Sequence, residues 1–191
     1  DVVYNHTFIA GQEEKSILDR VVPGYYHRLN AVGGIEASTC CFNTATENTM
    51  MAKLMIDSSV LWTRQYKIDS FRFDLMGHQP REAMVRLQQA VDKAAGRHVQ
   101  LIGEGWNFGE VADGARFVQA SQLSLNGTGI GTFSDRARDA MRGGSPGDSG
   151  LPVIKQQGYI NGLVYDANAL GGEAQKTDLL RAADLIRVGL A

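Results

Sequence analysis

The stretch IDSFRFDLMGH, residues 68–78, carries the strongest structural signal in this sequence. Strand side chains point alternately to opposite faces, so Phe71 and Phe73 share one face while Arg72 and Asp74 share the other. The aromatic face can be buried under a helix, whereas the charged face needs either a wet cleft or a mutual ion pair. Taken alone, the stretch leaves two interpretations equally open: a structural ion pair at a strand end, or part of a functional site.

The composition limits the class of protein. The chain has 191 residues, 43% of them hydrophobic and 21% charged, and a net charge of −2. This length supports one sizeable core, and the balanced charge predicts neither nucleic acid nor an anionic membrane surface as a partner. No apolar stretch approaches the roughly 18 residues of a membrane span. Because the sequence begins without methionine and in strand-like residues, we expect an internal fragment of a longer domain.

The cysteines are two in number and adjacent, Cys40 and Cys41, which is too few for a disulfide framework. The alternative is a vicinal disulfide, which is strained, so we expect buried thiols. No spacing of cysteine and histidine resembles a zinc site, since the four histidines lie far apart in sequence.

The order of elements predicts an α/β protein with a parallel sheet. The first half of the chain is expected to hold a strand end at 2–4, an irregular loop at 8–48, a helix at 49–65, a strand at 70–74, and a helix starting at Pro80 and ending at Gly96. The second half is expected to hold a strand at 98–104, a further strand entry at 127–133, a helix from Ser134 to Met141, loop-like residues at 143–172, and a helix at 176–191. The core face of this last helix is expected to consist of Leu179, Ala183, Ile186 and Leu190. Strands that alternate with helices in this way form parallel sheets with right-handed crossovers.

Polar side chains follow three of the expected strands. His6 follows the first, Arg72 and Asp74 close the second, and Glu104 ends the third. Function in parallel sheets gathers at the carboxyl ends of strands, so this recurrence favours a site over an isolated ion pair. Acids at adjacent strand ends lie about 4.8 Å apart, close to the roughly 5 Å that separates nucleophile and acid in a retaining glycosidase.

The two carboxylates are expected to play different parts. Arg72 would keep Asp74 anionic as the nucleophile. Glu104 has no cation beside it in sequence, so we expect it to hold a proton and act as the general acid.

Three motifs, in order, resemble those of the α-amylase superfamily of glycoside hydrolases. They are DVVYNH at 1–6, FRFDLMGH at 71–78 and GEGW at 103–106. Their particular forms, including GEGWNFGEV at 103–111, look like the pullulanase-type α-1,6-glucosidases of that superfamily. GIGTFSDR at 129–136 and LIRVGL at 185–190 are similar to the same branch, so the resemblance covers essentially the whole chain.

The resemblance implies a partial (β/α)8 TIM barrel that runs from the end of the third strand through the sixth strand and its helices. Residues 1–191 would form part of one catalytic domain that is incomplete at both ends. The implied reaction is hydrolysis of α-1,6-glucosidic branch linkages in pullulan, amylopectin, glycogen or limit dextrins, with an α-glucan polysaccharide as the partner. No cofactor is implied for the chemistry; a structural calcium ion is implied near Asn5.

The resemblance also assigns residue roles. Asp74 would be the nucleophile, Glu104 the acid/base, and Arg72 the support of the nucleophile. His6 and His78 would hydrogen-bond the sugar next to the cleaved bond. In isolation, either histidine would more simply be structural. Trp106 would provide an aromatic platform for the glucan.

The sequence departs from that family pattern in two respects. The family has a third essential carboxylate after a later histidine, but no histidine follows Glu104. Asn107 stands where the branch commonly has an aspartate. We therefore expect the fragment alone to be inactive. An open barrel would, in addition, leave sheet edges uncovered.

Other functions remain alternatives. Within the same superfamily these are an isoamylase, a branching enzyme or an α-1,4 amylase. A non-catalytic glucan-binding relative would keep the cleft without turnover, but it has no need of a matched nucleophile and acid. Metal-dependent phosphotransfer lacks a phosphate cradle and a dense acidic cluster in this sequence.

Overall fold

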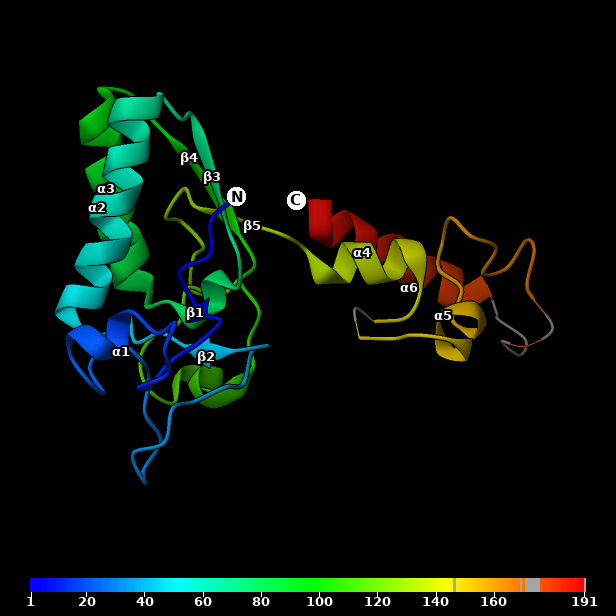
Figure 1. The fold of residues 1–191 in the computed structure, drawn as a ribbon. Coiled ribbons are helices and arrows are strands. Elements are labelled where there is room, and N and C mark those ends of the chain that lie inside the picture. Colours follow the sequence, from blue (N-terminus) through cyan, green and yellow to red (C-terminus); the bar gives the residue numbers. More distant parts are fainter. Residues whose placement is uncertain (146, 169, 171–175, 191) are drawn as a thin grey trace. The chain divides into compact units, whose positions relative to one another are not determined.

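The computed structural model describes residues 1–145, 147–168, 170 and 176–190 (Figure 1). By its internal contacts the chain divides into two compact units, Asp1–Phe133 and Ser134–Ala191. All the candidate site residues belong to the first unit. Within the described residues, no helix is both long and apolar enough to cross a membrane.

A three-stranded parallel sheet forms the centre of the first unit. Its strands are β3 (Ser70–Phe73), β4 (Gln100–Gly103) and β5 (Gly131–Thr132), in that spatial order. Phe73 lies opposite Gly103, so the residues that follow these two strands are also neighbours. The parallel order predicted for these segments is confirmed.

The first residues of the chain extend the sheet beyond β3. Val2 forms a parallel bridge with Phe73; its N–H donates to the Arg72 carbonyl at 2.9 Å, and its carbonyl accepts the Asp74 N–H at 3.0 Å. The strand expected at 2–4 is therefore reduced to one bridge. Four parallel segments nevertheless lie side by side in chain order.

Two helices, α2 (Thr49–Tyr66) and α3 (Arg81–Ala95), cover one face of this sheet. Figure 1 shows them side by side along β3 and β4. Their buried side chains pack against the aromatic face of β3 in one core that includes Met55, Phe71, Phe73, Met84, Leu87, Val91 and Leu101. The core confirms that the phenylalanines face inward, and Arg72 consequently lies on the uncovered face.

The boundaries of α3 follow from local chemistry. Pro80 is the residue before the helix and not its first residue, a correction of one position. Gly96 adopts a left-handed conformation, with φ 69°, and its N–H donates to the Asp92 carbonyl. The predicted stop at Gly96 is confirmed, because glycine adopts that conformation without a steric cost.

The long segment at 8–48 is mostly irregular, as predicted, but it is firmly held. It contains α1 (Leu18–Val21) and β2 (Phe42–Asn43), and β2 pairs antiparallel with β1 (His6–Thr7). Buried Asp19 accepts the N–H groups of Gly11 and Gly24 at 2.7 and 3.1 Å. Burial alone would raise the pKa of Asp19, but these hydrogen bonds outweigh it and lower the pKa.

Two short 3-10 helices complete the first unit. η1 (Met76–His78) follows β3, and η2 (Gly109–Gly114) follows β4. Each begins a few residues after a strand end, so both lie beside the candidate site.

The second unit is helical, with α4 (Asp135–Arg142), α5 (Leu151–Lys155) and α6 (Lys176–Leu190). Ser134 caps α4 as predicted, since its hydroxyl accepts the Ala137 N–H. α5 interrupts the stretch expected to be loop. The predicted core position of Leu190 is wrong within this unit, where its side chain is 73% exposed. Ala191, the last residue of the helix predicted at 176–191, lies outside the described residues.

The fold is thus a mixed helix and strand arrangement. The described residues hold one two-stranded and one three-stranded sheet, which are too small to confirm a partial (β/α)8 barrel. The assignment of the whole chain to one catalytic domain remains a prediction.

Candidate active site

Arg72 joins the two candidate catalytic carboxylates. Its Nη1 lies 3.1 Å from Asp74 Oδ1 and its Nη2 lies 2.6 Å from Glu104 Oε1. The register of β3 and β4 explains this, because Asp74 and Glu104 directly follow the paired residues Phe73 and Gly103. Glu104 has no cation next to it in sequence, but the structure supplies one, Arg72, from the neighbouring strand.

The backbone after Asp74 also engages Glu104. Leu75 is in the left-handed region, with φ 39° and ψ 49°, and its N–H donates to Glu104 Oε2 at 2.9 Å. Such a conformation costs a non-glycine residue about 1 kcal/mol or more and often marks a functional site. Both oxygens of Glu104 therefore accept hydrogen bonds, from Arg72 and from this strained turn.

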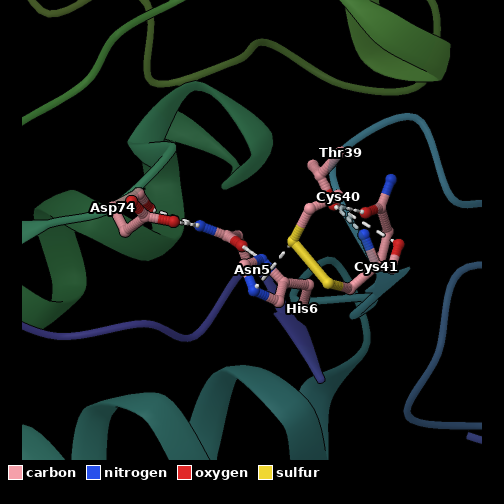
Figure 2. The surroundings of a disulfide bond; sticks show 7 residues. Asn5, His6, Thr39, Cys40, Cys41 and Asp74 are labelled. Atoms are coloured by element: carbon pink, nitrogen blue, oxygen red, sulfur yellow. Dashed lines mark hydrogen bonds between the residues drawn. A yellow bond between two sulfur atoms is a disulfide. The ribbon is translucent and has the colours of Figure 1, made fainter. Parts of the chain in front are cut away.

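Asn5 holds Asp74 from the other side. It is 1% exposed, and its Nδ2 donates to the Asp74 carbonyl at 2.6 Å and to Asp74 Oδ2 at 2.9 Å. Its Oδ1 faces His6 Nδ1, so His6 donates through Nδ1 and carries its lone pair on Nε2. Figure 2 shows this order, with Asn5 between Asp74 and His6. His6 is half-buried.

His78 is brought to the same region but is enclosed. His78 is 1% exposed, and its ring packs on the Phe108 ring with the two centroids 4.7 Å apart. Its Nε2 lies 3.2 Å from Ser38 Oγ, and its Nδ1 has no hydrogen-bond partner among the described residues. Burial lowers the pKa of His78 to about 4, so the ring is neutral at pH 7.

A buried arginine underlies His78. Arg28 Nε and Nη2 each lie 2.9 Å from the Glu47 carboxylate, and its Nη1 lies 2.8 Å from Glu110 Oε1. Arg28 Nη2 also donates to the His78 carbonyl at 3.0 Å. A fully buried guanidinium needs such pairing, because an unpaired charge there would cost several kcal/mol.

Glu110 completes this network. It accepts hydrogen bonds from Ser38 and, at 3.0 Å, from Asn43 Nδ2. Burial would raise the pKa of Glu110, but the hydrogen bonds from Ser38, Arg28 and Asn43 outweigh it and lower the pKa to about 2. Glu110 is therefore an anion at neutral pH, and it ties residues 28–43 to the segment after β4.

Sequence reasoning gave no role to Arg28 or Glu110. Glu110 lies inside the motif GEGWNFGEV at 103–111, and this motif was the signal in the sequence that could have identified it as a site residue. Arg28 lies in an irregular stretch, where no periodicity shows that it is buried.

Trp106 and Asn107 follow Glu104. Trp106 is half-buried, and a Cβ added to Gly77 would lie 2.2 Å from its carbonyl oxygen, so η1 packs directly on its backbone. Asn107 Nδ2 donates to Asp113 Oδ1 at 2.7 Å, and its Oδ1 accepts the Asp113 N–H at 2.8 Å. The amide of Asn107 thus stabilises η2. The platform role of Trp106 remains a prediction.

The cysteines differ from expectation. Cys40 and Cys41 form a vicinal disulfide, and Cys40 is exposed, so buried thiols were the wrong prediction. The disulfide lies beside His6, whose Nε2 is 3.5 Å from Cys40 Sγ (Figure 2). The pairing of β1 with β2 brings these residues together despite their separation in sequence.

Comparisons with known proteins identify relatives along the whole chain. No protein-family profile matches it. The chain is 48% identical over 202 residues to pullulanase 1, chloroplastic, of Arabidopsis thaliana, covering 100% of this chain and 20% of that protein. It is 46% identical over 193 residues to a pullulanase of Klebsiella pneumoniae, covering 100% of this chain and 17% of that protein.

Solved structures of pullulanases also match this chain. The crystal structure of Klebsiella pneumoniae pullulanase complexed with maltotriose matches with a TM-score of 0.89 at 42% identity, covering 99% of this chain and 18% of that one. The apo pullulanase of the same organism also matches with a TM-score of 0.89, at 44% identity, with coverage of 99% and 20%. The chain thus spans about a fifth of the length of these relatives.

Proposed function

Because this chain is homologous along its whole length to pullulanases, which are glycoside hydrolases, we propose that it forms part of a retaining enzyme that cleaves α-1,6-glucosidic branch linkages. Pullulan, amylopectin, glycogen and limit dextrins are the proposed substrates. The observation that carries the proposal is that Arg72 forms salt bridges with both Asp74 and Glu104. Arg72 holds two carboxylates from adjacent strand ends close together, as a retaining glycosidase requires, and it also pairs with exposed Asp1.

The proposed chemistry uses the two carboxylates in turn. Asp74 attacks the anomeric carbon while Glu104 protonates the departing oxygen, and Glu104 then activates the water that releases the sugar. Glu104 accepts two hydrogen bonds in this structure, the arrangement of a carboxylate. For the acid step, its Oε1 must therefore turn from Arg72 toward the glycosidic oxygen and carry a proton.

His6, His78 and Trp106 are proposed to bind the sugar. His6 is half-buried and adjacent to Asn5, which supports a contact with sugar next to Asp74. His78 is enclosed by Ser38 and Phe108, so its contact with sugar requires Ser38 to move aside. Trp106 would stack on a pyranose face.

The rest of the proposed site lies in a longer protein. A (β/α)8 barrel of about 250 residues would contribute the remaining strands and a third carboxylate. The four parallel segments in chain order support such a barrel. A structural calcium ion also stays a prediction, and the side chain of Asn5 does not support it, because its amide is already engaged by Asp74 and His6.

The test is hydrolysis of pullulan by the full-length enzyme and three variants, one of them a control. We expect Asp74→Asn and Glu104→Gln to lose reducing-sugar release, while Asp69→Asn, at the exposed residue just before β3, keeps it. The wild type should act on pullulan and leave linear amylose intact. Retained activity in Asp74→Asn would remove the nucleophile assignment, and cleavage of amylose would favour an α-1,4 amylase. The isolated 191-residue chain should release no sugar.

A further inference from the structure

The disulfide and His6 present three potential metal ligands at one point. One ligand atom from each of His6, Cys40 and Cys41 lies within 4.8 Å of the other two, the only such group of histidine, cysteine and acidic side chains found among the described residues. Figure 2 shows the imidazole of His6 beside the S–S bond, on the side away from Asp74. Cys40 is exposed, so solvent, a reductant and ions can reach this group.

His6 is already oriented as a ligand. Metal-binding histidines characteristically use one ring nitrogen for the ion and donate the other N–H to an oxygen that fixes the ring. Here His6 Nδ1 donates to Asn5 Oδ1, and Asn5 is itself held by Asp74. The lone pair on Nε2 therefore faces Cys40 Sγ.

The spacing also fits a tetrahedral ion. Zinc binds sulfur at about 2.3 Å and imidazole nitrogen at about 2.0–2.1 Å, which places the two ligand atoms about 3.6 Å apart at a tetrahedral angle. The distance from His6 Nε2 to Cys40 Sγ is 3.5 Å. Once the S–S bond is open, the second sulfur can move to the similar separation that two zinc-bound thiolates require.

We propose that reduction of the Cys40–Cys41 bond by a dithiol converts His6, Cys40 and Cys41 into a three-ligand site for a thiophilic divalent cation such as Zn²⁺. The dithiol supplies two electrons and two protons and becomes a disulfide, while the S–S bond of the protein becomes two thiols. The cation then binds both sulfurs as thiolates, and their two protons pass to solvent. Three protein ligands leave the fourth position to water.

Occupancy of this site affects the neighbouring carboxylate region. An ion on Nε2 removes that nitrogen from any contact with sugar, and His6 is linked through Asn5 to Asp74. The bound cation should therefore inhibit the reduced enzyme, a consequence that rests on the function proposed above.

Cadmium is the direct probe, because its thiolate complexes absorb in the near ultraviolet. The full-length protein is reduced with dithiothreitol, freed of it under argon and titrated with Cd²⁺, with Zn²⁺ as competitor. We expect one more ion to bind the reduced than the oxidised protein, with a sulfur-to-metal charge-transfer band. Cys40→Ser and Cys41→Ser should each weaken this binding by more than about 100-fold, since even outer-shell changes cost 10–100-fold. His98→Gln, which alters an exposed histidine paired with Asp92, should bind as the wild type does.

The outcomes separate this site from the proposed function. Equal binding and equal spectra for the reduced wild type and Cys40→Ser would overturn the site, whatever the activity. The charge-transfer band together with a lack of pullulan hydrolysis would support the site and overturn the function. Inhibition of the reduced wild type by Zn²⁺, absent from Cys40→Ser, would support the site's effect on His6.

Discussion

Glu104 and Glu110 lie close together in sequence, yet they belong to two differently built halves of the candidate site. Glu104, with Arg72 and Asp74, forms the strand-end half, which is set by the register of β3 and β4. Glu110 belongs to the loop half, in which buried Arg28 joins residues distant in sequence beneath His78. We propose that the first half performs the chemistry and that the second holds the first in shape.

The largest expected effect separates these glutamates directly. Glu104→Gln should lower kcat on pullulan by about 10²–10⁴-fold, the usual contribution of a general acid, with little change in unfolding free energy. Glu110→Gln should do the reverse: it removes charge-assisted hydrogen bonds worth about 1.5–3 kcal/mol and leaves most of kcat intact. Steady-state kinetics and urea unfolding of both variants in the full-length enzyme provide the measurement. A larger kcat loss in Glu110→Gln would show that the halves do not divide in this way.

Removal of the central cation of the loop half should have the next largest effect. Arg28→Met leaves Glu47 and Glu110 without their buried partner, and we expect a loss of about 3–5 kcal/mol in unfolding free energy. Arg116→Met is the matched control. Arg116 is exposed, and it pairs with Glu36, which lies on the same loop as Arg28. That surface pair should be worth less than about 1 kcal/mol. Similar losses in the two variants would contradict the buried role of Arg28.

The loop half should also make stability sensitive to acid. Burial lowers the pKa of His78 from 6.5 to about 4, so the unfolded chain binds a proton more readily than the folded one. This contribution is complete above pH 6.5 and is lost as the pH falls to 4, by at most about 3 kcal/mol. Glu110, with its pKa lowered from 4.5 to about 2, adds a further loss below pH 4.5.

Urea unfolding between pH 7.5 and 4.5 measures this loss. His78→Asn should flatten the slope between pH 6.5 and 4.5, while His98→Gln should keep it. An unchanged slope in His78→Asn would assign the acid sensitivity to other groups.

The smallest expected effect concerns the contact between the turns that follow the two strands. A Cβ at position 77 would lie 2.2 Å from the Trp106 carbonyl, so Gly77→Ala must shift one turn and should cost about 1–3 kcal/mol. Gly131→Ala is the control, because its Cβ would meet only ordinary contacts at 3.5 Å and beyond. Thermal unfolding compares the two. Equal melting temperatures would mean that the turns are not tightly packed.

The strand-end half could be predicted from sequence because its signals are local. The alternation of Phe71 with Arg72 fixed the faces of β3, and Gly96 marked the end of α3. The position of Arg72 against Glu104 could not be predicted, since it depends on register between strands. That register supplies Glu104 with a cation that its own sequence neighbourhood lacks.

The loop half could not be predicted, because nothing periodic marks it. Arg28 is charged and lies in an irregular segment, and only its distant partners Glu47 and Glu110 reveal why it is buried. The proximity of His6 to Cys40 is similar, since it follows from the pairing of two two-residue strands. Such short pairings leave no alternation long enough to detect.

The central claim is that Asp74 is a nucleophile served by Glu104, and trapping its covalent intermediate is the most direct test. In Glu104→Gln, an activated substrate such as an α-maltosyl fluoride still glycosylates the enzyme without acid assistance, whereas release of the sugar lacks its base. Mass spectrometry of peptic peptides should then show one glycosyl group, attached at Asp74. A label on another carboxylate, or steady turnover of the fluoride by Asp74→Asn, would contradict the account.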